Sequence, residues 1–107
     1  HLARMLLTYK TRMEHFNAAL TAALGKDLVI GGRHSGLHLL LTLPGAGGER
    51  AMVEAAGREG VFLHGLSEYY LARPERCPPD TVVAGYAALA DEDIPGAAAA
   101  LARAWLG

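Results

Sequence analysis

The segment from Leu37 to Leu43 limits most strongly the folds open to this chain. Leucines occupy its odd positions, and His38, Leu40 and Thr42 lie between them. Because successive side chains of a β-strand point to opposite faces, this alternation predicts a strand with one fully apolar face. Such a face must be buried, so we expect other elements of the chain to cover one side of a sheet.

Three other segments carry apolar residues at helical spacing. The first predicts an amphipathic helix from Arg4 to Leu24 that ends at Gly25, and the second a short helix over 49–59 with Gly60 as its C-cap. The third follows three acidic residues at 91–93, which suit the positive end of a helix dipole, and it tolerates a proline in its first turn. The buried stripes expected from this spacing are Met5, Tyr9, Met13, Phe16, Leu20 and Leu24, then Met52, Val53, Ala55 and Ala56, and finally Ile94, Ala98, Leu101 and Trp105.

Further strands are expected at 28–30, 61–66 and 81–87. The segment 67–80 between the last two is expected to be a structured loop or a flap, since its prolines forbid a regular element over 73–80. The resulting order is helix, strand, strand, helix, strand, strand, helix. We therefore predict one α+β domain over 1–107, with a three- to four-stranded, mainly antiparallel sheet and helices packed on one face.

The composition excludes some functions. The chain has ten Lys and Arg residues and eleven Asp and Glu residues. It therefore lacks the excess positive charge that binds nucleic-acid phosphates. Cys77 is the only cysteine, which rules out an internal disulfide and suits the cytoplasm. We expect no membrane partner, because no apolar run approaches the roughly 18 residues that span a bilayer and no signal peptide is visible. The chain begins at His1 rather than at a methionine, so we expect a fragment of a longer protein.

Short motifs occur in a fixed order along almost the whole chain. They are His1-Leu2-Ala3-Arg4-Met5 with Tyr9, Gly36-Leu37-His38-Leu39, Gly60-Val61, Leu66-Ser67-Glu68-Tyr69-Tyr70 and Gly85-Tyr86-Ala87-Ala88-Leu89. In this order and spacing they resemble the C-terminal small domain of MocR-type regulators of the GntR family. That domain belongs to the aminotransferase-like half of these regulators and to the fold-type-I pyridoxal-phosphate superfamily.

The resemblance implies a full-length protein with more parts than this chain holds. It implies a winged-helix DNA-binding domain, then a large domain that binds pyridoxal 5'-phosphate and usually dimerises. The lysine that holds the cofactor would lie in that large domain, so neither Lys10 nor Lys26 is assigned to it. We therefore expect no catalytic, cofactor-binding or metal-binding residue in this chain, and contact with DNA only through the missing domain. The expected partners are the preceding large domain of the same chain and a second copy of the full-length protein in a homodimer.

One position departs from the pattern of catalytic aminotransferases. Their small domain supplies an arginine that pairs with the substrate carboxylate, and alignment on Gly85-Tyr86-Ala87 places Val83 there. A valine cannot bind a carboxylate. The departure favours a regulator over an aminotransferase, although Arg33, Arg73 or Arg76 in a loop is an alternative source of the missing guanidinium.

Ser67, Tyr69 and Tyr70 are the candidates for a ligand cleft, because the resemblance places their loop at the edge of the cofactor site. The alternative is that both tyrosines are ordinary aromatic residues that pack on the sheet. His38 and His64 are expected to pack in strands, and His34 with His38 does not form a metal-binding pair, since a turn separates them. Cys77 has no assigned role.

Three functions stay open at this point. The first is a cofactor-sensing transcription regulator, of which this chain is the C-terminal effector part and is inert as a catalyst by itself. The second is the small domain of a true class I/II aminotransferase. The third is a self-sufficient α+β module for dimerisation or binding, whose motif matches arise by chance.

Overall fold

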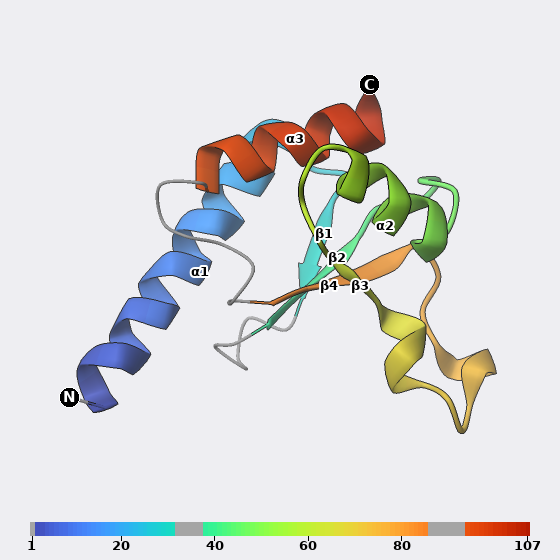
Figure 1. The fold of residues 1–107 in the computed structure, drawn as a ribbon, viewed down its shortest axis with the longest axis horizontal. Helices are drawn as coiled ribbons and strands as arrows, with labels where there is room; N and C mark the ends of the chain where they lie inside the picture. The colour runs from blue at the N-terminus through green and yellow to red at the C-terminus, as the bar shows by residue number, and fades with distance from the viewer. Residues whose placement is uncertain (1, 32–37, 86–93) are drawn as a thin grey trace.

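The computed structural model describes residues 2–31, 38–85 and 94–107, and within them the side chains of 10–31, 39–84 and 94–107 (Figure 1). Three helices, four strands and two short 3-10 helices make up these ranges. In chain order they are α1 (Leu2–Leu24), β1 (Val29–Gly31), β2 (His38–Thr42), α2 (Glu49–Arg58), β3 (His64–Gly65), η2 (Leu66–Tyr69), η3 (Pro74–Arg76), β4 (Thr81–Gly85) and α3 (Ile94–Leu106).

The four strands form one antiparallel sheet in the order β1-β2-β4-β3. Leu41 of β2 pairs with Ile30 on one side and with Val82 on the other, so β2 and β4 are the central strands. All three helices lie on the same side of this sheet (Figure 1). The predicted α+β class, the element order and the antiparallel pairing of the first two strands are confirmed.

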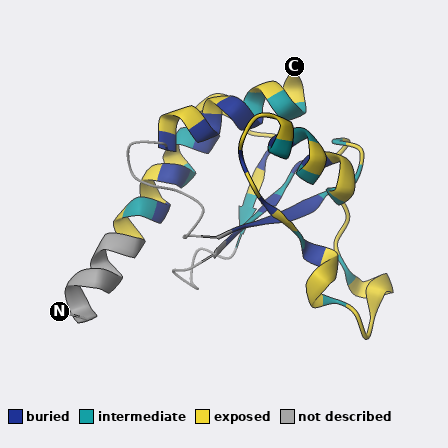
Figure 2. Cartoon of the chain, viewed as in Figure 1, coloured by how far each residue is buried: buried dark blue, intermediate teal, exposed yellow. Residues whose placement is uncertain are grey.

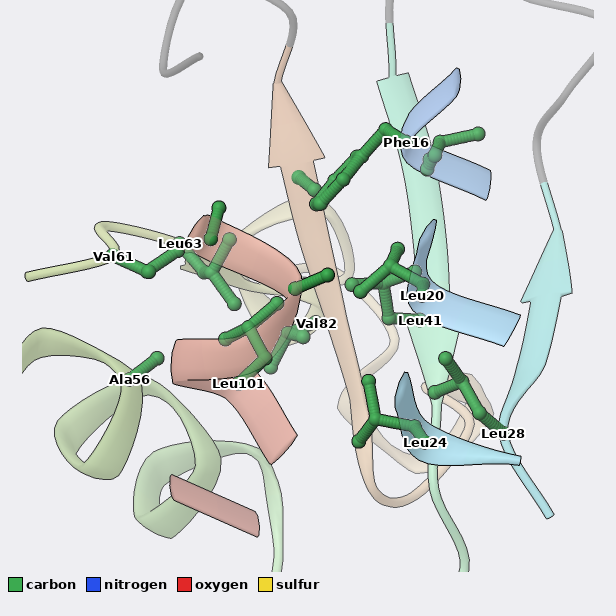
Figure 3. Packing of buried hydrophobic residues seen from close by; sticks show 14 of the residues in the cluster. Phe16, Leu20, Leu24, Leu28, Leu41, Ala56, Val61, Leu63, Val82 and Leu101 are labelled. Carbon is green, nitrogen blue, oxygen red and sulfur yellow. The ribbon is translucent and has the colours of Figure 1, made fainter. Parts of the chain in front are cut away.

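The core fills the space between the sheet and the helices. Leu39 and Leu41 are almost wholly buried, as their odd positions predict, and they lie on the same sheet face as their strand partners Ala84 and Val82. From the helices, the fully buried Leu20 and Leu101 meet this face (Figure 3). The predicted stripes are confirmed at Met13, Phe16, Leu20, Leu24, Met52, Ala56, Ile94, Ala98 and Leu101. Val53, Ala55 and Trp105, also predicted as buried, are only half-buried. Met5 and Tyr9 lie outside the described side chains.

Two glycines end helices where the sequence predicts it. Gly25 follows α1 with φ 83°, and its N–H donates to the Thr21 carbonyl. Gly60 follows α2 with φ 86°, while the N–H groups of Gly60 and Val61 donate to Gly57 and Ala56. The second pattern is a Schellman motif, which turns the chain out of the helix and starts its path back toward the sheet.

The strand predicted over 61–66 is wrong in extent, because β3 contains only His64 and Gly65. Its end has a physical cause. The Glu49 carboxylate lies against Gly65, where a Cβ atom would collide with it. The same carboxylate accepts a hydrogen bond from the N–H of Ser67, two residues further along. The chain therefore leaves the sheet and coils into η2.

The segment 67–80 also needs a correction. It is a structured loop, as predicted, but the prolines do not forbid every regular element, because η3 spans Pro74–Arg76. Pro74 stands at the first position of η3, where a helix does not use the N–H that proline lacks. The predictions for 86–87 and for the acidic residues at 91–93 lie outside the described residues.

Candidate functional site

The sheet face opposite the helices carries Val83, the position at which the resemblance to aminotransferases implies an arginine. Val83 of β4 pairs with Leu40 on one side and His64 on the other, so these three residues share that face. Val83 is 3% exposed, and Leu40 is half-buried. Next to this row, the Thr42 and Thr81 hydroxyls are hydrogen-bonded at 2.9 Å. The centre of this face is thus mostly apolar, and position 83 is occupied by a valine.

Several large apolar side chains of the chain are more than half exposed. Val29 is 58% exposed and Phe62 is 74% exposed, and in the segment after β3 Tyr69 and Leu71 reach 64% and 85%. Figure 2 shows that the segment between β3 and β4 is exposed over most of its length. Clusters of exposed apolar residues of this kind mark surfaces that contact another protein part or a ligand.

Ser67 is the best anchored of the three predicted cleft residues. Its N–H donates to Glu49 Oε1 at 3.0 Å, and its hydroxyl donates to Glu49 Oε2 at 2.6 Å. Because Glu49 is in the first turn of α2, this contact ties η2 to that helix. Tyr69 ends η2 with an exposed ring, and half-buried Tyr70 donates its N–H to the Ser67 carbonyl.

A shallow hollow of about 500 Å³ lies beside Ser67. It is lined by α2 residues, among them Glu49 and Val53, together with Gly65, Ser67 and Glu68. Neither Tyr69 nor Tyr70 lines it, so the three candidates do not meet around this hollow. Sequence reasoning missed Glu49, although two signals were present: an acidic residue in the first turn of a helix, and a glycine in the facing strand.

Cys77 belongs to the same cluster. Its Sγ lies 3.9 Å from Glu49 Oε1 and 3.6 Å from the Pro78 carbonyl oxygen. Burial, the negative charge of Glu49 and the hydrogen bond to that carboxylate all raise the pKa of the Cys77 thiol. The raised pKa disfavours the thiolate, which is the reactive form of a cysteine.

Asp80 is a second residue that sequence reasoning missed. Its carboxylate accepts the Gly48 N–H at 2.7 Å and the Gly45 N–H at 3.2 Å, while its carbonyl accepts the Leu43 N–H. Asp80 has φ 52°, a left-handed conformation that aspartate tolerates better than most residues. This single residue holds the loop that leads into α2, and so it positions Glu49.

The other polar candidates are at the surface. His64 Nδ1 lies 3.5 Å from Glu68 Oε2, with both side chains more than half exposed. Lys10 and Lys26 are exposed, as are Arg73 and Arg76. Among the described residues, no three His, Cys, Asp or Glu side chains are grouped as a metal site would need. Arg33, His34 and the side chain of His38 lie outside the described part.

Comparison with known proteins identifies regulators of transcription as relatives. No family model matches the chain. It is 34% identical over 105 residues to an uncharacterized HTH-type transcriptional regulator of Bacillus subtilis (strain 168), YhdI, and 31% identical over 105 residues to a second one, YdeL. Each match covers 98% of this chain but only 22% of the relative. Over nearly its whole length, the chain is thus similar to about a fifth of each of these regulators.

Proposed function

We propose that this chain is the C-terminal effector part of a pyridoxal-phosphate-dependent regulator of the MocR type in the GntR family. The observation that carries the proposal is the match to two HTH-type regulators over 98% of the chain. The α+β fold with the element order of an aminotransferase small domain supports it. The near balance of ten basic and eleven acidic residues supports DNA contact through a separate HTH domain, in a protein that acts in the cytoplasm.

In this proposal the helix-free sheet face meets the large domain that binds the cofactor. Val83 is already buried on this face and Leu40 is half-buried, whereas Val29 and Phe62 add exposed apolar surface that a neighbouring domain would bury. Both lysines of this chain are exposed on or beside α1 and do not line the hollow beside Ser67. The lysine that attaches pyridoxal phosphate then belongs to the large domain, where the cofactor supplies reversible bonding to amines.

Val83 favours a regulator over an aminotransferase in this proposal. At this position a catalytic relative would need a guanidinium to hold the substrate carboxylate. Val83 instead packs between Leu40 and His64. The candidates for the rim of the ligand cleft stay Ser67, Tyr69 and Tyr70. Of these, Ser67 is hydrogen-bonded to Glu49 and lines the hollow described above.

The test uses the full-length protein that contains this chain. We expect it to bind pyridoxal phosphate, seen as an absorbance band of the lysine-bound cofactor. We also expect binding to DNA upstream of its own gene in gel-shift assays, altered by the cofactor, and a dimer in sedimentation. A full-length protein without an HTH domain or cofactor band contradicts the proposal. Steady conversion of amino acids to keto acids favours the aminotransferase, and a stable monomeric 107-residue chain that binds a ligand unaided favours the stand-alone module.

A further inference from the structure

A second hollow lies at the C-terminal end of α3 and shares no lining residue with the hollow beside Ser67. Its volume is about 310 Å³. The lining consists of Asp27 in the turn after α1, the loop 43–46 after β2, and Trp105 with Leu106 in the last turn of α3. Three segments far apart in the sequence therefore meet here, and the resemblance described above assigns no role to any of them.

The indole of Trp105 is a fixed wall of this hollow. Its Nε1–H donates to the Met52 carbonyl of α2 at 3.0 Å, and the side chain is half-buried against the core. A ring held in this way does not have to be ordered when a ligand binds, so its face is available at little entropic cost. Indole is also the aromatic ring that attracts cations most strongly.

Several N–H groups of the residues that line the hollow are already hydrogen-bonded within the protein. The N–H groups of Leu43, Gly45 and Ala46 all donate to acceptors within the protein, at 3.1, 3.2 and 3.1 Å. Pro44 has no N–H, and the indole N–H of Trp105 is used by Met52. Among the lining residues, exposed Asp27 alone carries a charged side chain, and its carboxylate is a hydrogen-bond acceptor.

No positive charge of the lining competes for this carboxylate. Lys26 precedes Asp27 but does not line the hollow. Arg103, one turn before the end of α3, is engaged by Glu59, with Nε and Oε1 2.8 Å apart. A ligand that enters must bring its own donors and a positive charge, and it meets apolar surface at Leu43 and at Leu106, which is 57% exposed.

We propose that this hollow binds an organic cation, an ammonium or guanidinium group on a short alkyl chain. The charged group would lie between the Asp27 carboxylate and the Trp105 ring, with the alkyl chain against Leu106. A volume of about 310 Å³ is at the lower end of the range for small-molecule sites and suits a group of this size. Two sources share this chemistry: the side chain of a lysine or arginine in a partner protein, and a free amine.

Trp105 is the only tryptophan of the 107 residues, and its indole N–H signal in the NMR spectrum of the full-length protein reports on this hollow. The probes are n-butylammonium, n-butylguanidinium and 1-butanol, which matches the first in size but lacks the charge. We expect a saturable change with either cation and none with 1-butanol. An equal response to 1-butanol overturns the proposal, and this comparison requires no mutant.

Asp27→Asn tests the role of the carboxylate, and Glu14→Gln is its matched control, since Glu14 is an exposed acid on α1 outside the lining. We expect Asp27→Asn to weaken n-butylammonium binding about threefold to fivefold, as loss of a solvent-exposed ion pair does. Glu14→Gln should leave it unchanged, with circular dichroism showing both variants folded. Equal affinities of the two variants contradict the proposal. N-acetyl-lysine-N-methylamide then separates the sources, because tighter binding than n-butylammonium indicates a protein side chain, and weaker binding a free amine.

Discussion

The Glu49 carboxylate accepts both the N–H and the hydroxyl of Ser67, at 3.0 and 2.6 Å. These residues are 18 positions apart, and their contact joins the start of α2 to the start of η2. The same carboxylate lies against Gly65 and next to the Cys77 thiol. One acidic side chain thus lies against the last residue of β3, holds the predicted cleft residue Ser67, and adds to the effect of burial in raising the pKa of the only cysteine.

Replacing Glu49 by alanine should loosen this arrangement. Loss of two hydrogen bonds to a charged, half-buried acceptor is expected to lower the free energy of unfolding by about 1–2 kcal/mol. Urea denaturation followed by circular dichroism measures the change. Glu54→Ala on the same helix is the control, since Glu54 forms an ion pair with Arg50 in which the side chains are 58% and 92% exposed. Equal effects of the two substitutions would contradict the role given to Glu49.

Cys77 should react slowly with thiol reagents such as a disulfide of thionitrobenzoate. Burial and the adjacent Glu49 raise its pKa, so at a given pH less of the reactive thiolate is present than in an unfolded chain. The rate profile of the folded protein should therefore lie at higher pH than that of the urea-unfolded protein. Glu49→Gln removes the negative charge, which lowers the pKa and raises the rate at pH 8. A folded-state profile at lower pH than the unfolded one would show this account to be wrong.

Asp80 should be more sensitive to alanine than to asparagine. Alanine removes the acceptor for Gly45 and Gly48 and is strained at φ 52°, so we expect a loss of about 2 kcal/mol in the free energy of unfolding. Asparagine keeps one acceptor oxygen and tolerates left-handed backbone, and about half that loss is expected. Thermal and urea unfolding of the two variants give the comparison. A reversed order would mean that the loop 44–48 does not depend on this carboxylate.

Leu101 and Leu106 form a matched pair on α3. Leu101 is fully buried where α3 packs on the core, whereas Leu106 is 57% exposed. Leu101→Ala should cost about 2–5 kcal/mol through lost burial and a residual cavity. Leu106→Ala should stay within about 0.5 kcal/mol, as most surface substitutions do. Similar unfolding midpoints for both variants would contradict the packing of α3 described above.

The sequence by itself determined the elements and the faces they bury. The alternation around Leu39 and Leu41 identified the buried side of β2, the helical stripe predicted Phe16 and Leu20 as core residues, and Gly25 marked the end of α1. These features are local. A strand repeats every two residues and a helix every 3.6, so a stretch of about ten residues carries the whole signal.

Only the tertiary structure decided how these elements meet. It placed β4 between β2 and β3, ended β3 after Gly65, and brought Glu49 to Ser67 and Asp80 to Gly48, a pair 32 residues apart. Periodicity records that a face is buried but not which partner buries it. A carboxylate that caps a distant turn leaves no repeat in the sequence, because its effect depends on where the folded backbone brings the free N–H groups.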